Sequence, residues 1–176
     1  KVSANLSTSN VVYGKDLINI SGALFNSSEM QSEGNIIIGL NTTNKGRILT
    51  DNILHIGGMT LNEGTLYGKN KISLQGLTNS GSVQSTGEIT AKNVVNTGKI
   101  IGEGNITVLD LDNQNELLTN KILTTNNLVN TGILNTGEGI SSNGNVVNHG
   151  ELKTNGSFLI LGNLNNYNLL NVGGSL

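Results

Sequence analysis

Apolar and polar positions recur at fixed distances along most of the chain. The phrase Asn-x-Gly-x-Ile at residues 96–100 is followed by the alternating segment Ile106-Thr107-Val108, and this arrangement returns at a nearly constant interval. The asparagines that open successive copies are Asn44, Asn62, Asn79, Asn96, Asn113, Asn130, Asn148 and Asn166. An apolar residue stands four positions after each of these asparagines, and another stands ten positions after it. A fixed period of this length indicates a repeat architecture.

Each copy predicts short strands separated by turns. Alternating runs such as residues 72–74 and 106–108 are typical of strands of about three to five residues with one buried face. Gly, Asn, Ser and Thr between these runs predict turns, and no stretch has helical spacing. Gly stands two positions after most of the opening asparagines, with Asn115 and Asn168 as replacements. We expect left-handed backbone geometry at this position, because Gly and Asn tolerate it best.

A single copy is too short to close a core of its own, so the copies must stack on one another. Parallel connections between strands favour the right hand. The sequence therefore predicts an all-β fold, a right-handed parallel β-helix of about ten coils of 17–18 residues, on the order of 50 Å long. In this fold the eight asparagines form a buried column whose amides hydrogen-bond along the axis.

The prediction treats residues 1–176 as a single segment of a longer fibre. Residues 40–176 follow the repeat closely. Residues 1–39 fit only as irregular coils with an insertion near residues 25–35.

Charged residues are also placed by the repeat. Lysines and glutamates of neighbouring coils share positions and are expected to pair as Lys45–Glu63, Lys71–Glu88, Lys99–Glu116 and Lys121–Glu138. Opposite charges on neighbouring strands stabilise a sheet by a few tenths to about 1 kcal/mol. The alternative is that these charges form a binding face.

The composition excludes several classes of partner and site. The formal net charge is -2, which gives no basic footprint for nucleic acid. The longest apolar runs are far shorter than the roughly 20 residues that span a bilayer, so membrane insertion is not expected. The absence of cysteine excludes disulfides, a CxxC metal site and a thiol nucleophile. About 30 asparagines and 24 glycines would suggest disorder, but the 35% of hydrophobic residues recur in register.

No cofactor, metal or catalytic residue is assigned from the sequence. The glycine segments 102–104 and 137–139 do not complete a nucleotide-binding motif. The two histidines, His55 and His149, occupy different positions of the repeat, which argues against a shared metal site.

The densest carboxylate group is Asp110, Asp112 and Glu116, with Lys99 nearby. Such residues carry acid–base chemistry in glycoside hydrolases, but aromatic residues are only 3% of this chain and are scattered along it. A carbohydrate-active enzyme is therefore a minor alternative. Five Asn-x-Ser/Thr sequons are about as many as this composition yields by chance; they begin at Asn5, Asn26, Asn41, Asn105 and Asn155.

The repeat resembles the filamentous haemagglutinin repeat family. The resemblance rests on units such as "LTNSGSVQSTGEITAKN" and "VVNTGKIIGEGNITVLD", which cover residues 77–110, and it extends over about residues 40–176. It implies a right-handed parallel β-helix on a Gram-negative cell surface, secreted through an outer-membrane partner. The family's secretion module typically carries NPNL and NPNG motifs, whereas this chain has no proline. The chain thus resembles the shaft, and no binding residue can be carried over.

The function expected from this resemblance is that of a rigid, non-enzymatic shaft segment of a secreted surface adhesin or toxin. Such a shaft presents a binding or effector region to a receptor or glycan on a host or neighbouring cell. The alternative is direct binding of a glycan or receptor by residues 25–35 and their neighbours.

Overall fold

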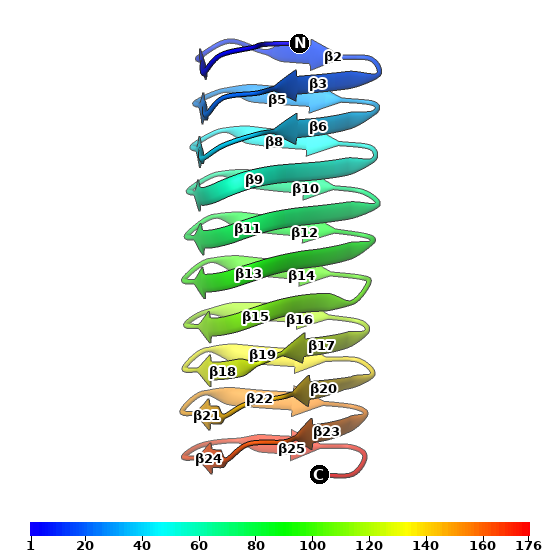
Figure 1. Cartoon of the computed structure of the whole chain (residues 1–176). Coiled ribbons are helices and arrows are strands. Elements are labelled where there is room, and N and C mark those ends of the chain that lie inside the picture. The colour runs from blue at the N-terminus through cyan, green and yellow to red at the C-terminus, as the bar shows by residue number, and fades with distance from the viewer.

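The computed structural model describes all of residues 1–176 and contains 25 strands and no helix. The strands stack in parallel as a β-solenoid of about nine turns that winds to the right (Figure 1). The predicted fold class is therefore confirmed. Each strand pairs with its counterparts one repeat before and one repeat after it, so the backbone hydrogen bonds run along the axis.

One side of the solenoid is a ten-stranded parallel sheet. It consists of β2 (Val12–Gly14), β5 (Glu29–Ser32), β8 (Arg47–Thr50), β10 (Thr65–Gly68), β12 (Ser82–Ser85), β14 (Lys99–Gly102), β16 (Glu116–Thr119), β19 (Ile133–Thr136), β22 (Glu151–Thr154) and β25 (Leu170–Val172).

The other fifteen strands form a sheet with two faces. The second face contains β3 (Leu17–Ile20), β6 (Asn35–Ile38), β17 (Ile122–Thr125), β20 (Gly139–Ser142) and β23 (Ser157–Ile160). The third face contains β1 (Leu6–Thr8), β4 (Leu24–Asn26), β7 (Thr42–Asn44), β18 (Asn127–Asn130), β21 (Val146–Asn148) and β24 (Leu164–Asn166). In the middle of the chain one long strand per coil serves both faces; these are β9 (Ile53–Asn62), β11 (Lys71–Asn79), β13 (Glu88–Asn96) and β15 (Ile106–Asn113).

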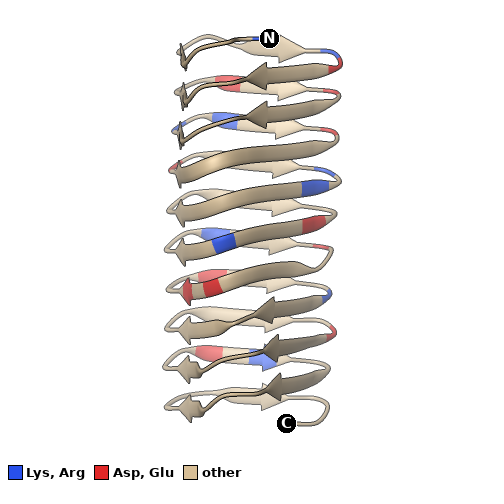
Figure 2. Ribbon diagram, viewed as in Figure 1, with Lys and Arg blue, Asp and Glu red and all other residues tan.

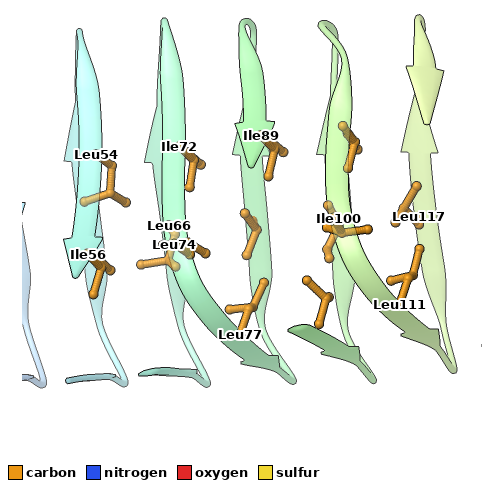
Figure 3. Packing of buried hydrophobic residues seen from close by; sticks show 14 of the residues in the cluster. Leu54, Ile56, Leu66, Ile72, Leu74, Leu77, Ile89, Ile100, Leu111 and Leu117 are labelled. Atoms are coloured by element: carbon orange, nitrogen blue, oxygen red, sulfur yellow. The ribbon is translucent and has the colours of Figure 1, made fainter. Parts of the chain in front are cut away.

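A single column of 28 buried hydrophobic residues fills the interior. Ile48, Leu66 and Val83 stack from coil to coil, as do Leu54, Ile72 and Ile89, and all six are buried. Figure 3 shows this packing, with Ile100 and Leu117 continuing the first of these columns. The apolar positions read from the repeat are thus the core.

Residues 25–35 are not an insertion, and this prediction is wrong. Phe25 pairs with Thr43 and Glu29 pairs with Arg47, so each lies one ordinary repeat before its partner, as in later coils. β4 and β5 are therefore ordinary strands of a regular coil. This coil differs from the later ones in sequence and not in structure, because Asn26 is followed by two serines where most later copies have Asn-x-Gly.

The expected left-handed backbone is also wrong, because no residue of the chain has a positive φ. Glycine follows the opening asparagine for a steric reason. A Cβ on Gly81 would lie 2.1 Å from the carbonyl oxygen of Gly64 in the coil before it. Where Asn115 replaces glycine, its Nδ2 donates to the carbonyl of Thr97 in the preceding coil, at 3.2 Å.

Candidate functional site

The predicted asparagine column exists and is one residue longer than predicted. Each Nδ2 donates to the Oδ1 of the asparagine in the next coil, at 2.7 to 2.8 Å. Eight of its nine members are completely buried, and the ninth, Asn166, lies exposed in the last coil. We call this column the asparagine ladder; it consists of Asn26, Asn44, Asn62, Asn79, Asn96, Asn113, Asn130, Asn148 and Asn166.

The ladder also binds the backbone at the corner between the third face and the ten-stranded sheet. The Nδ2 of Asn113 donates to Oδ1 of Asn130 at 2.8 Å, to the carbonyl of Ile133 at 3.0 Å and to that of Asn115 at 3.2 Å. Its Oδ1 accepts from Asn96 at 2.8 Å. Because a buried amide needs all its hydrogen-bonding groups satisfied, these contacts make the ladder a structural element.

A second set of asparagines was missed at the sequence level. The Oδ1 atoms of Asn5, Asn41, Asn127 and Asn145 each accept a hydrogen bond from a backbone N–H of the next coil, at 2.8 to 3.1 Å. Each of these residues stands three positions before the ladder position of its coil. In each case the next coil begins 18 residues later, not 17. That combination is the sequence signal that could have identified them.

The three carboxylates proposed as a possible acid–base group do not come together. Asp110 and Asp112 lie on β15 and line a hollow of the third face, whereas Glu116 lies on β16 and pairs with Lys99 at 2.7 Å. Asp110 accepts from Nδ2 of Asn127 at 2.8 Å. The chain contains no group of three His, Cys, Asp or Glu side chains placed to hold a metal ion.

The two histidines lie at different places in the solenoid, His55 on a strand and His149 in the turn that follows β21. His55 is on β9 beside Ser73, with 3.4 Å between Nδ1 and Oγ. His149 stacks on Tyr167 of the next coil, with ring centroids 4.4 Å apart. The glycine segments 102–104 and 137–139 lie at strand ends and turns, and no helix follows either of them.

All four predicted charge pairs are present. The Nζ–O distances are 3.4 Å for Lys45–Glu63, 2.9 Å for Lys71–Glu88 and 2.7 Å for Lys99–Glu116, and Lys121 also contacts Glu138. These side chains are partly exposed, so each pair stabilises the fold only slightly. Positive and negative residues are mixed over the surface of the solenoid (Figure 2).

The third face carries two hollows on its outer side. One, of about 390 Å³, lies over β13, β15 and β18 and is lined by Asn93, Val94, Val95, Asp110, Leu111, Asp112, Asn127 and Val129. The other, of about 380 Å³, lies over β1, β4 and the start of β7. Between them the side chain of Met59 covers Gly76, where a Cβ would meet the methionine sulfur at 2.5 Å.

No protein-family model matches this chain, and no curated protein or solved structure matches it. The chain has no helix that is long and apolar enough to cross a membrane. The resemblance to the filamentous haemagglutinin repeat therefore stays a prediction from the sequence pattern.

Proposed function

We propose that this chain is a rigid, non-enzymatic shaft segment of a secreted bacterial surface adhesin or toxin of the filamentous haemagglutinin type. In this role it holds a binding or effector region away from the cell that secretes it. A receptor or glycan on another cell is the partner of the whole protein, and an outer-membrane partner exports it.

The asparagine ladder is the observation that carries this proposal. It runs through nine consecutive coils without a gap, and each amide connects its own coil to the next. Together with 128 backbone hydrogen bonds, most of which join one coil to another, the ladder resists bending and separation of the coils. A quasi-one-dimensional stack of this kind gains length with every coil and needs no particular side chain on its surface.

The placement of the ionisable side chains supports a non-enzymatic role. Lys99 and Glu116 neutralise each other at the surface. Asp110 and Asp112 accept hydrogen bonds from Asn127 and Gln114, and no histidine, lysine or arginine lines their hollow. General acid–base catalysis needs two groups of different proton affinity converging on one substrate, and this arrangement does not supply them.

The alternative of direct binding through residues 25–35 loses its original basis. It depended on an insertion, and these residues are instead part of a regular coil. A binding role for the third face rests on a different observation and is developed below.

Deletion of complete coils tests the shaft proposal. Removing residues 79–112, which make up two complete coils, places Asn113 directly after Thr78 and leaves the ladder in register. In the chain we expect a folded solenoid that is shorter by about 10 Å in X-ray scattering. In the protein that carries the chain, we expect export and adhesive or toxic activity to persist.

Deletion of residues 79–86 is the matched control, because half a coil breaks the register and should prevent folding. The shaft proposal is wrong if the 79–112 deletion variant folds and is exported but has lost its activity on other cells. Such a result would mean that the deleted side chains act directly.

A further inference from the structure

The outermost row of the third face alternates between polar and apolar side chains. This outer row consists of the residues that immediately precede the ladder positions. In eight consecutive coils it reads Ser7, Phe25, Thr43, Leu61, Thr78, Val95, Asp112 and Val129. The next coil places Val147 beside Val129, and the alternation ends there. The four apolar members are each 38 to 41% exposed. Neither the core nor the asparagine ladder requires this alternation, because these side chains point outward.

The alternation sets a repeat distance along the fibre. Neighbouring strands lie about 4.8 Å apart, so apolar side chains recur at intervals of about 9.6 Å. A ligand that lies along the fibre axis and has the same repeat distance can place an equivalent apolar surface on each of these apolar side chains. In an extended β-1,4-linked glycan alternate rings are flipped, so that the same ring face recurs every second ring, over a distance close to this one.

The hollow over β13, β15 and β18 provides the polar groups that such a ligand needs. Asn93, Asp110 and Asn127 form a second row beside the outer row, with one residue in each coil. Sugar hydroxyls both donate and accept, which suits amides next to carboxylates. The hollow is lined by two carboxylates and by no cationic side chain, and the exposed Lys92 next to Asn93 lies outside this lining. The excess of negative charge disfavours sulfated or other anionic glycans.

We propose that the third face binds an extended, neutral β-1,4-linked glycan along the fibre axis. Val95 and Val129 contact apolar ring faces, and Asp110, in the coil between them, binds hydroxyls of the intervening ring. This binding goes beyond the shaft function and does not depend on it. A shaft with such a face adheres to polysaccharide along its length as well as through whatever it presents.

Peptides fit this face less well. Two residues of an extended peptide span about 6.6 Å, which does not match the repeat, and a strand pairs with a sheet edge, which this face does not offer. A polyproline II helix has a repeat of about 9 Å, but prolines have no N–H to donate to the two carboxylates. The carboxylates therefore favour the glycan.

Titration of the ¹⁵N-labelled chain with cellohexaose tests this proposal. Maltohexaose, which has the same sugar but a curved α-1,4-linked chain, is the control for ligand shape, and decaproline is the control for a peptide. We expect saturable shifts only with cellohexaose, at the amides of β13, β15 and β18. No saturable shift with cellohexaose, equal shifts with maltohexaose, or saturation by decaproline instead would overturn the proposal.

Matched variants locate the site. Val95→Thr combined with Val129→Thr keeps shape and strand preference and should weaken cellohexaose binding about tenfold, which corresponds to about 1.4 kcal/mol. Asp110→Asn should weaken it as well. Ile133→Thr removes a similarly exposed side chain from the ten-stranded sheet and should change nothing.

Equal affinity of the double variant and the Ile133→Thr variant would place any binding elsewhere and overturn the proposal. An unchanged amide spectrum outside the altered residues confirms that each variant is folded. The coil-deletion experiment measures the length and the export of the shaft and does not measure glycan binding. A failure of glycan binding therefore does not change the result of the test of the proposed function.

Discussion

Replacing Asn113 with aspartate isolates the contribution of one asparagine of the ladder. The two side chains have almost the same shape, so no cavity forms. The change replaces the Nδ2 donor by an oxygen that faces the Oδ1 of Asn130 and the carbonyls of Ile133 and Asn115, at 2.8 to 3.2 Å. Four oxygens would then meet in a site with no solvent access at Asn113.

The cost follows from the burial. A carboxylate cannot stay ionised against three acceptors, so we expect its pKa to rise by about three units above the value of about 3.9 in the unfolded chain. Holding the new carboxyl protonated at pH 7 then costs about 4 kcal/mol, at about 1.4 kcal/mol per unit. One O–H replaces two N–H donors, which adds about 1 kcal/mol. We expect the free energy of unfolding to fall by about 5 kcal/mol, a large part of the roughly 5 to 15 kcal/mol that is typical of a domain.

The loss should depend on pH in one direction. The folded pKa of the new carboxyl is raised above the unfolded value, so the unfolded chain binds fewer protons between the two values and a rise in pH favours unfolding. Lowering the pH from about 7 to about 4 should therefore recover most of the lost stability relative to the native chain at the same pH.

Urea unfolding followed by circular dichroism at pH 7 and pH 4 measures both effects, with amide hydrogen exchange of β15 and β16 as the local readout. The matched control is Asn166→Asp at the exposed end of the ladder, where the Nδ2 donates only to the carbonyl of Asn168. If the Asn113→Asp variant is no less stable than this control, or if its stability loss is the same at both pH values, the ladder does not stabilise the fold in this way.

Three smaller changes test other parts of the fold. Thr60→Val should raise the free energy of unfolding by about 1 kcal/mol in urea titrations, because the Thr60 hydroxyl is buried without a hydrogen-bond partner. Thr119→Val should lower the free energy of unfolding, because the Thr119 hydroxyl donates at 2.7 Å to the carbonyl of Gly104. Gly81→Ala should lower the melting temperature clearly, since the new Cβ would lie 2.1 Å from the carbonyl oxygen of Gly64; an unchanged value would contradict the steric explanation of this glycine. The hydrogen bond that Tyr13 donates to Glu33 raises the pKa of the Tyr13 phenol. The stabilisation from this bond is therefore present at neutral pH and is lost as the pH rises through that raised value. Tyr13→Phe should remove this loss of stability at alkaline pH, measured by urea unfolding.

The asparagine ladder, the core columns and the charge pairs could be predicted because the offset in sequence between successive coils determines them. Once Asn96 and Asn113 occupy the same position of successive coils, Ile100 must stack on Leu117, and Lys99 must lie beside Glu116. Parallel pairing in register leaves no freedom in these contacts. The asparagine ladder, the core columns and the four charge pairs all follow from this single fact.

Other features could not be read from the repeat because they depend on distances in space. The steric need for Gly81 comes from a carbonyl oxygen in the preceding coil, that of Gly64, and a sequence pattern does not distinguish this need from a left-handed φ. Asn26 was missed because two serines follow it, although its side-chain contacts are those of the later asparagines. The hollows of the third face depend on how the side chains of neighbouring coils are placed in space, which residue types alone do not specify.

Inward and outward positions of this fold are under different physical constraints. An inward side chain touches its equivalents in the coils before and after it, so a change such as Asn113→Asp disturbs three layers at once. An outward side chain such as Val95 touches solvent and can change without loss of the fold. The alternation at outward positions, which runs through eight coils and ends at Val147, is therefore not required by the fold. That reasoning, more than the size of either hollow, is why we assign ligand binding to the third face and rigidity to the asparagine ladder.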